Sequence, residues 1–252
     1  MERTAMSEII CITPTGDRPI PFELSRKWMA QQTLKPTRWI IVDDGKIPME
    51  PWVCEDYEFY VRREPQPNDP KHTLVKNIET ALLHIDREIN DTKIIFWEDD
   101  EYYSFEYIAE MSSRLDRTQV VGIGCARYYH LPTGGYMLHN NMQHASLAQT
   151  AFHIRALPMV DECVAQGMEK DWLDCNIWRR VMKSKGIIPH DIFKDTKHLF
   201  VGMKGLPGRF GIGVGHKKDV YRMHDNPDRG VLKEWIPDYY DIYLGLLEGA
   251  KV

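Results

Sequence analysis

The sequence pattern near the start of the chain predicts a strand, a helix and a second strand. This arrangement restricts the chain to few folds. Residues 9–12, Ile-Ile-Cys-Ile, form a short apolar strand that ends in a turn-rich loop. Pro19 suits the first turn of a helix that ends before Lys35, and residues 39–42 follow as the second strand. Such a βαβ unit makes both strands parallel, so both carboxyl ends lie at one edge of the sheet.

Apolar periodicity further along the chain extends this pattern. A strand is predicted near residues 57–61, and apolar residues at helical spacing predict a helix over residues 74–89. Residues 94–97 form the next buried strand, and a helix follows over residues 104–115. These elements predict an α/β fold with a mostly parallel central sheet flanked by helices.

The second half of the chain departs from this alternation. Residues 120–129 predict a strand that returns through residues 136–138 after a Pro-Thr-Gly-Gly turn, which makes a small antiparallel hairpin. A further helix is predicted over residues 171–183. Residues 202–215 are rich in glycine and follow neither the helical nor the strand period, so we expect a mobile loop there.

The overall composition suits one compact domain. The chain has 252 residues, of which 43% are hydrophobic, and this is enough for a sizeable core. We expect a catalytic domain over residues 1–215 and a C-terminal extension packed on it over residues 216–252. No apolar run approaches the roughly 18 residues that span a bilayer, and no signal-peptide pattern is present, so we expect a soluble, cytoplasmic protein.

Cysteine spacing and net charge narrow the classes of function. The five cysteines are odd in number, widely spaced and contain no Cys-x-x-Cys pair, which argues against a disulfide framework and against a zinc site. The formal net charge of −5 gives no general attraction to nucleic acid. Residues 194–222 are nevertheless rich in lysine and arginine, so an anionic ligand is expected in that segment.

Four consecutive acids, Glu98, Asp99, Asp100 and Glu101, follow the buried strand at residues 94–97. The run contains no basic residue, so its carboxylates repel one another unless a cation lies among them. Carboxylates at the end of a strand can converge on a hard divalent cation, which leaves coordination sites for a phosphate-bearing ligand. Asp100 is the expected direct ligand and Glu98 its partner through water or a ribose hydroxyl. A solvated acidic turn is the alternative.

Loops elsewhere add polar groups that suit an anionic ligand. Open α/β sheets bind ligands at the carboxyl edge, where the loops after the first two strands lie. Lys204 and Arg209 lie in the glycine-rich segment, whose cations can counter phosphate charge; a surface loop without a ligand is the alternative. The candidate ligand-binding residues are Thr13, Pro14, Thr15, Asp17, Arg18, Asp43, Asp44, Glu98, Asp99, Lys204 and Arg209.

The order of these motifs resembles that of the inverting GT-A glycosyltransferases of family two. Ile-Thr-Pro-Thr, Val-Asp-Asp-Gly, Glu-Asp-Asp and an acidic helix start at residues 169–171 occur in the family's order and on its elements, over roughly residues 8–185. Two positions depart from the family's pattern. Glu98 stands where the metal motif usually begins with aspartate, and Lys170 separates the two acids of the base motif.

The resemblance implies the GT-A fold and a nucleoside-diphosphate-sugar donor, usually UDP-linked, bound at the sheet edge. By this similarity Thr13, Pro14 and Thr15 would line the nucleoside pocket. Asp44, or else Asp43, would accept a hydrogen bond from the uracil N–H.

The resemblance also implies Mn²⁺ or Mg²⁺ at Asp100, where the ion would bridge the diphosphate. A divalent ion is worth several kcal/mol against the negative charge that builds on the leaving phosphate. His216 and His224 lie where such enzymes often supply a late metal ligand. Most histidines in a chain are structural or surface residues, which is the alternative for both.

Attack by an acceptor hydroxyl requires a general base, and a partly buried carboxylate can have its pKa raised toward a useful value. Asp171 is the first candidate, Asp174 the second and Glu169 the third. Asp171, Asp174 and Trp178 share one face of the predicted helix. An acid that only stabilises the positive end of this helix is the alternative.

Three other functions remain open on the residues alone. A phage-type DNA glycosyltransferase would act on a hydroxymethylated base, and the basic segment keeps this possible although the net charge does not favour it. A sugar nucleotidyltransferase usually carries a glycine-rich signature after the first strand, where this chain has one glycine, Gly16. The third is a non-catalytic nucleotide-sugar-binding module. The acceptor of a transferase is a glycan, a small molecule, a protein or modified DNA.

Overall fold

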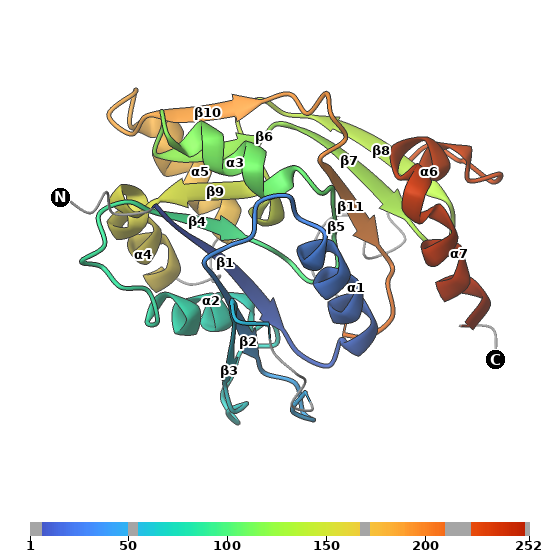
Figure 1. Ribbon diagram of the computed structural model, residues 1–252, viewed down its shortest axis with the longest axis horizontal. Helices are drawn as coiled ribbons and strands as arrows, with labels where there is room; N and C mark the ends of the chain where they lie inside the picture. Colours follow the sequence, from blue (N-terminus) through green and yellow to red (C-terminus); the bar gives the residue numbers. More distant parts are fainter. Residues whose placement is uncertain (1–6, 50–54, 167–171, 210–222, 250–252) are drawn as a thin grey trace.

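The computed structural model describes residues 7–49, 55–166, 172–209 and 223–249. Its centre is a seven-stranded sheet in the order β10-β6-β9-β4-β1-β2-β3 (Figure 1). Strand β9 runs antiparallel to its two neighbours, and the other adjacent pairs are parallel, which confirms the predicted sheet. The strands are β1 (Glu8–Thr15), β2 (Arg38–Asp43), β3 (Glu58–Arg62), β4 (Thr92–Phe96), β6 (Val120–Ile123), β9 (Thr150–His153) and β10 (His190–Phe193).

The predicted βαβ unit is present at the start of the chain. Helix α1 (Pro19–Ala30) connects β1 to β2 and carries proline in its first turn. The parallel register pairs Thr15 with Asp43, so the two strands end side by side at the same edge. The loops that follow them therefore meet there, as the sequence predicts.

Helices cover both faces of the central sheet, and alternate residues of each strand feed two apolar cores. In β1, Ile9 and Cys11 pack in the core with α1 and α3 (Tyr107–Leu115). Ile10 and Ile12 pack in the opposite core. The helices of that second core are α2 (Leu74–Leu82), α4 (Leu157–Ala165) and α5 (Leu173–Lys183).

Helix α2 is shorter than the apolar spacing over residues 74–89 predicts. It ends at Leu82, and Leu83 is 77% exposed. Ile85 lies beyond the helix but is buried in the same core as Ile78. The turn after Leu82 returns the chain to the same face of the sheet, so Ile85 is buried although it lies outside the helix.

A second sheet of four strands lies beside the first, in the order β5-β11-β7-β8. Strands β7 (Cys125–His130) and β8 (Gly135–Asn140) form the predicted antiparallel hairpin. The sequence predicted one strand over residues 120–129, but the chain passes between the two sheets at Gly124. A Cβ atom at Gly124 would lie 2.5 Å from the Ile192 side chain, so the crossing point has no room for a larger residue.

Strand β11 (Phe200–Lys204) overturns part of the loop predicted over residues 202–215. It is buried, pairs with β5 (Tyr102–Tyr103) and with β7, and contains Gly202. A Cβ atom at Gly202 would lie 2.3 Å from the Tyr128 ring, so this glycine accommodates an aromatic neighbour. Residues 210–215 lie outside the described part of the chain.

The described C-terminal residues pack on the first core. Trp235 of α6 (Gly230–Trp235) and Tyr243 of α7 (Tyr240–Gly249) are buried, and the Tyr243 ring centroid lies 6.1 Å from that of Trp28. The predicted boundary after residue 215 falls outside the described residues. No helix in the described ranges has the length and apolar character needed to cross a membrane.

The short 3₁₀ helices are η1 (Leu147–Gln149), η2 (Ile154–Ala156) and η3 (Pro237–Tyr239).

Candidate functional site

A cavity of about 890 Å³ lies at the carboxyl ends of β1 and β4. Thr15 lines it from the end of β1, and all four acids of residues 98–101 line it from the segment after β4. Tyr128 of β7 and Lys204 of β11 contribute from the second sheet, and Asp174 contributes from α5. The carboxyl edge that the sequence identifies as the ligand edge therefore carries the cavity.

The acids of residues 98–101 are not a solvated turn. Asp99, Asp100 and Glu101 are each less than 5% exposed, and Glu98 is half-buried. One carboxylate oxygen from each of Glu98, Asp100 and Glu101 lies within 4.8 Å of the others. An all-oxygen donor set at this spacing suits a hard divalent cation.

Two cations from other parts of the chain partly neutralise this cluster. Arg18 Nη1 lies 2.9 Å from Asp99 Oδ1, and the same guanidinium also pairs with Asp100. Lys204 Nζ lies 2.6 Å from Glu101 Oε1. Residues distant in sequence therefore supply part of the positive charge that was expected from a divalent cation.

Electrostatic strain remains on Glu98, Asp99 and Glu101, and burial raises the pKa of Glu101 to about 8 although Lys204 acts in the opposite direction. Burial raises the pKa of Glu98 well above its ordinary value, and the negative charges of Asp100 and Glu101 raise it further. Burial also raises the pKa of Asp99 to about 6, although the Arg18 guanidinium acts in the opposite direction. Thr15 Oγ1 donates to Asp99 Oδ2 at 2.7 Å, which fixes this carboxylate against the first strand.

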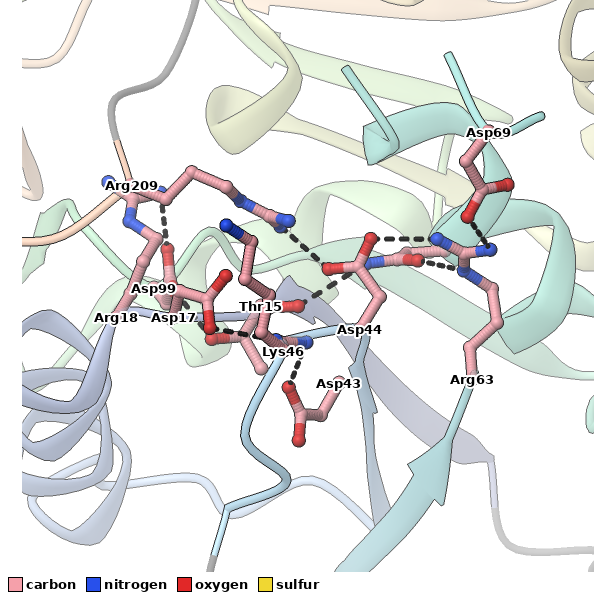
Figure 2. A network of polar contacts seen from close by, with 12 residues as sticks. Thr15, Asp17, Arg18, Asp43, Asp44, Lys46, Arg63, Asp69, Asp99 and Arg209 are labelled. Carbon is pink, nitrogen blue, oxygen red and sulfur yellow. Dashed lines mark hydrogen bonds and ion pairs between the residues drawn. The ribbon is translucent and has the colours of Figure 1, made fainter. Parts of the chain in front are cut away.

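Asp44 lies between two arginines, as Figure 2 shows, and is not among the residues that line the cavity. Its Oδ2 accepts from Arg63 Nη2 at 2.7 Å, and its Oδ1 accepts from Arg209 Nη2 at 2.7 Å. Burial raises the pKa of Asp44, but hydrogen bonds from Arg209, Thr73 and Arg63 lower it more, so the pKa lies below its ordinary value. A uracil N–H at Asp44 would have to share the carboxylate with these two arginines.

Asp43 is fully buried and does not line the cavity. Its Oδ1 accepts from the Gly45 N–H at 2.8 Å, and its Oδ2 accepts from the Tyr60 hydroxyl at 2.9 Å. Asp17 also lies away from the cavity, and its Oδ1 accepts from the Lys46 N–H at 2.8 Å. These contacts shape the loops after β1 and β2, which Figure 2 shows side by side.

Thr13 was expected to line a nucleoside pocket, and its placement corrects that expectation. Its side chain is fully buried, donates to the Trp97 carbonyl and accepts from Trp39 Nε1 at 2.7 Å. Pro14 and Thr15, the next two residues, do line the cavity. Thr13 lies further inside β1, whereas Pro14 and Thr15 lie at its carboxyl end, where the cavity is.

The two basic residues predicted to cover a diphosphate both line the cavity. Lys204 is buried within β11 and held by Glu101, so it belongs to a strand and not to a loop. Arg209 follows β11, and its side chain is 38% exposed while it pairs with Asp44. Arg209 is therefore the more accessible of the two cations.

Of the predicted late metal ligands and the two first candidates for the base, the structure describes His224 and Asp174. His224 is exposed and pairs through its backbone with Tyr136; it lines no part of the cavity. His216 and Asp171 lie outside the described residues. Asp174 lines the cavity from the first turn of α5, and its Oδ2 lies 3.2 Å from His144 Nε2.

Several cavity residues were not found from the sequence. Glu101 stood in the acidic run without an assigned role. His144 and Cys175 are 31 residues apart and match no spacing motif, yet Cys175 Sγ lies 3.6 Å from His144 Nε2. Trp172, 40% exposed just before α5, also lines the cavity.

Comparison with known proteins gives a likeness at the level of fold. No family model and no curated protein matches the chain. Solved structures of S. aureus TarS do match. TarS 1–349 superposes with a TM-score of 0.50 at 13% identity over 78% of this chain and 60% of that chain. TarS 1–349 in complex with UDP-GlcNAc gives 0.52 at 13% identity, over 79% and 59%.

A longer TarS structure gives a TM-score of 0.51 at 12% identity, over 78% of this chain and 36% of that chain. This chain thus spans about three fifths or less of the TarS chains it matches. At such low identity the likeness concerns the fold alone. Together with the seven-stranded, mostly parallel sheet between helices, it shows that the chain has the GT-A fold.

Proposed function

We propose that the chain is a metal-dependent, inverting glycosyltransferase that transfers a sugar from a UDP-sugar to an acceptor hydroxyl. The observation that carries the proposal is the buried acid cluster of Glu98, Asp100 and Glu101, which faces a cavity at the carboxyl edge of a GT-A fold. The cavity volume of about 890 Å³ suits a nucleotide sugar. TarS, which shares the fold, has been crystallised with UDP-GlcNAc.

The donor atoms of the acid cluster fit Mn²⁺ or Mg²⁺. All three groups are carboxylates, and their oxygens lie close enough to share one ion. Such an ion, when bound, supplies positive charge against the negative charge of the leaving diphosphate. Asp100 would exchange its contact with Arg18 for the ion, so Arg18 would become available to an anionic ligand.

Two guanidinium groups at the cavity favour a phosphate-bearing ligand. Arg18 and Arg209 both line the cavity, and arginine binds phosphate oxygens through paired N–H donors. Each now contacts a carboxylate of this edge, Asp100 and Asp44 respectively. A diphosphate would offer the same kind of acceptor, so we propose that both arginines move from carboxylate to phosphate contacts.

Inversion requires a single displacement in which the acceptor hydroxyl loses its proton to a base. We propose Asp171 for this role, with Asp174 as the second candidate. Asp174 lines the same cavity as Asp100, which places an acid of this segment beside the donor edge. Glu169 and His216 lie outside the described residues and stay proposals, and His224 lies away from the cavity.

The acceptor is left open among a glycan, a small molecule, a protein and modified DNA. No contact in the described part of the chain favours DNA, because three cations of the basic segment pair with acids. Lys197 pairs with Glu110, and Lys204 and Arg209 pair as described above. The nucleotidyltransferase alternative also gains no support, since its expected glycine-rich signature is missing after β1.

A donor-hydrolysis screen tests the proposal directly. The protein is incubated with a panel of UDP-, GDP- and dTDP-sugars, with Mn²⁺ or with EDTA, and released nucleoside diphosphate is measured. We expect hydrolysis of one UDP-sugar with Mn²⁺ and none with EDTA. Binding without turnover would support the non-catalytic module, and absence of both binding and turnover across the panel would overturn the proposal.

A further inference from the structure

A second group of metal-ligating side chains lines the cavity, apart from the acid cluster after β4. His144 lies between β8 and η1, and Asp174 and Cys175 are adjacent in the first turn of α5. One ligand atom from each of the three residues lies within 4.8 Å of the others. All three are half-buried and line the cavity, so an ion from solution can reach them.

The contacts of His144 converge on a single ring nitrogen. Its Nε2 lies 3.2 Å from Asp174 Oδ2 and 3.6 Å from Cys175 Sγ. A Cys-His-Asp proton relay needs the thiol and the carboxylate on opposite ring nitrogens, because one nitrogen receives the proton while the other is held. The observed arrangement therefore does not fit a relay.

The same distances fit the edges of a tetrahedral metal site. With Zn–N and Zn–O near 2.1 Å and Zn–S near 2.3 Å, a tetrahedron separates N from O by about 3.4 Å and N from S by about 3.6 Å. The observed separations of 3.2 and 3.6 Å need only small movements to reach these values. Asp174 Oδ1 accepts from the Cys175 N–H at 2.9 Å, which orients the carboxylate.

The donor set also selects the kind of metal. One imidazole, one thiol and one carboxylate are the ligands of zinc and similar transition metals, whereas Mg²⁺ takes oxygen ligands. We propose that His144, Asp174 and Cys175 form a binding site for Zn²⁺ or a similar transition-metal ion, with its remaining coordination open to the cavity. This site differs in chemistry from the all-oxygen cluster of Glu98, Asp100 and Glu101.

The site has a consequence for proton transfer in the same cavity. A carboxylate that ligates an ion is a poor proton acceptor, because the ion stabilises its deprotonated form. Asp174 would then serve as a ligand, and the role of base would remain with Asp171. Metal binding at this site does not depend on glycosyl transfer, so the two proposals can fail separately.

Cobalt binding to the full chain tests the site, since Co²⁺ substitutes for Zn²⁺ and a cobalt–thiolate bond gives a charge-transfer absorption band. We expect one equivalent of Co²⁺ to produce this band and one equivalent of Zn²⁺ to abolish it. Cys175→Ser should remove the band, and His144→Gln should weaken Zn²⁺ binding by at least about tenfold in calorimetry. Both positions are half-buried, and circular dichroism checks that the variants fold.

Two matched variants locate the binding. Cys125→Ser removes another half-buried thiol and should leave the cobalt band unchanged. Asp100→Asn alters the acid cluster and should also leave the band unchanged. A band that survives Cys175→Ser, a band lost in Cys125→Ser, or no thiolate band in the wild-type protein would overturn the proposal.

Discussion

Lys204 Nζ lies 2.6 Å from Glu101 Oε1, and both side chains are buried in the wall of the cavity. Burial disfavours the charged form of Lys204, but the Glu101 carboxylate holds the pKa of Lys204 above its ordinary value. The Met203 N–H donates to the other oxygen of Glu101 at 2.6 Å. The pair therefore links β11 to the segment before β5 and fixes the last acid of the cluster.

Removing one member of this pair should destabilise the protein strongly. Lys204→Met leaves the Glu101 charge buried and unpaired, and we expect a loss of about 3–5 kcal/mol in the free energy of unfolding. Lys197→Met is the matched control, because Lys197 is exposed and pairs with Glu110 at the surface; its expected cost is much smaller. Urea denaturation measures both. Equal losses in the two variants would contradict the buried-pair account.

Asp100→Asn tests the proposed catalytic metal. The variant keeps the shape of the side chain but weakens its hold on a divalent ion, and Arg18 keeps its contact with Asp99. An ion that contributes several kcal/mol makes a loss of about 10²–10³-fold in Mn²⁺-dependent donor turnover the expected result. Thermal unfolding should change little. Asp116→Asn, which alters an exposed partner of Lys93, should keep full turnover.

Asp44 should make the stability of the protein depend on pH in the acid range. Its pKa is lower in the folded protein, so its contribution is complete above the ordinary aspartate pKa and is lost as pH falls through the lowered value. We expect Asp44→Asn to cost about 1–3 kcal/mol at neutral pH. The difference from wild type should shrink below about pH 4. A difference that stays constant from neutral pH down to the acid transition would contradict this assignment.

The order of the elements was readable because local patterns determine it. The run Ile9 to Ile12 and the run Trp39 to Val42 are apolar on both faces, as in a sheet covered by helices on both sides, and the prolines mark the helix between them. Strand β11 was missed because Gly202 breaks the strand pattern. That glycine is explained by the ring of Tyr128, which belongs to a neighbouring strand and cannot be inferred from local sequence.

The candidate site was predictable at its centre and not at its margins. The acids of residues 98–101 stand out because four charges follow a buried strand. Arg18 precedes its partner Asp99 by 81 residues, and Lys204 follows its partner Glu101 by 103 residues. These ion pairs therefore depend on the fold and cannot be read from local sequence. The same holds for His144 and Cys175, whose contact no local spacing predicts. The cysteine spacing argued against a zinc site, and the proposed site at these residues departs from that expectation.

The assignment of the base decides whether a single displacement occurs. Asp171→Asn keeps the size and polarity of the side chain but cannot accept a proton, so transfer should fall by about 10²–10⁴-fold. Binding of UDP and Mn²⁺, measured by calorimetry, should be unchanged. A slower transfer rate with unchanged binding of UDP and Mn²⁺ is expected for a group that acts only in the transition state.

Asp174→Asn is the matched comparison, one turn further along the same segment. If Asp174 is a metal ligand beside His144, its replacement should remove the cobalt–thiolate signal or shift it, while transfer in a Zn²⁺-free buffer stays within a few-fold of wild type. A large loss of transfer in Asp174→Asn with none in Asp171→Asn would assign the base to Asp174. Full transfer in both variants would mean that these acids only stabilise the start of α5, and the inverting mechanism would then require a base from another element.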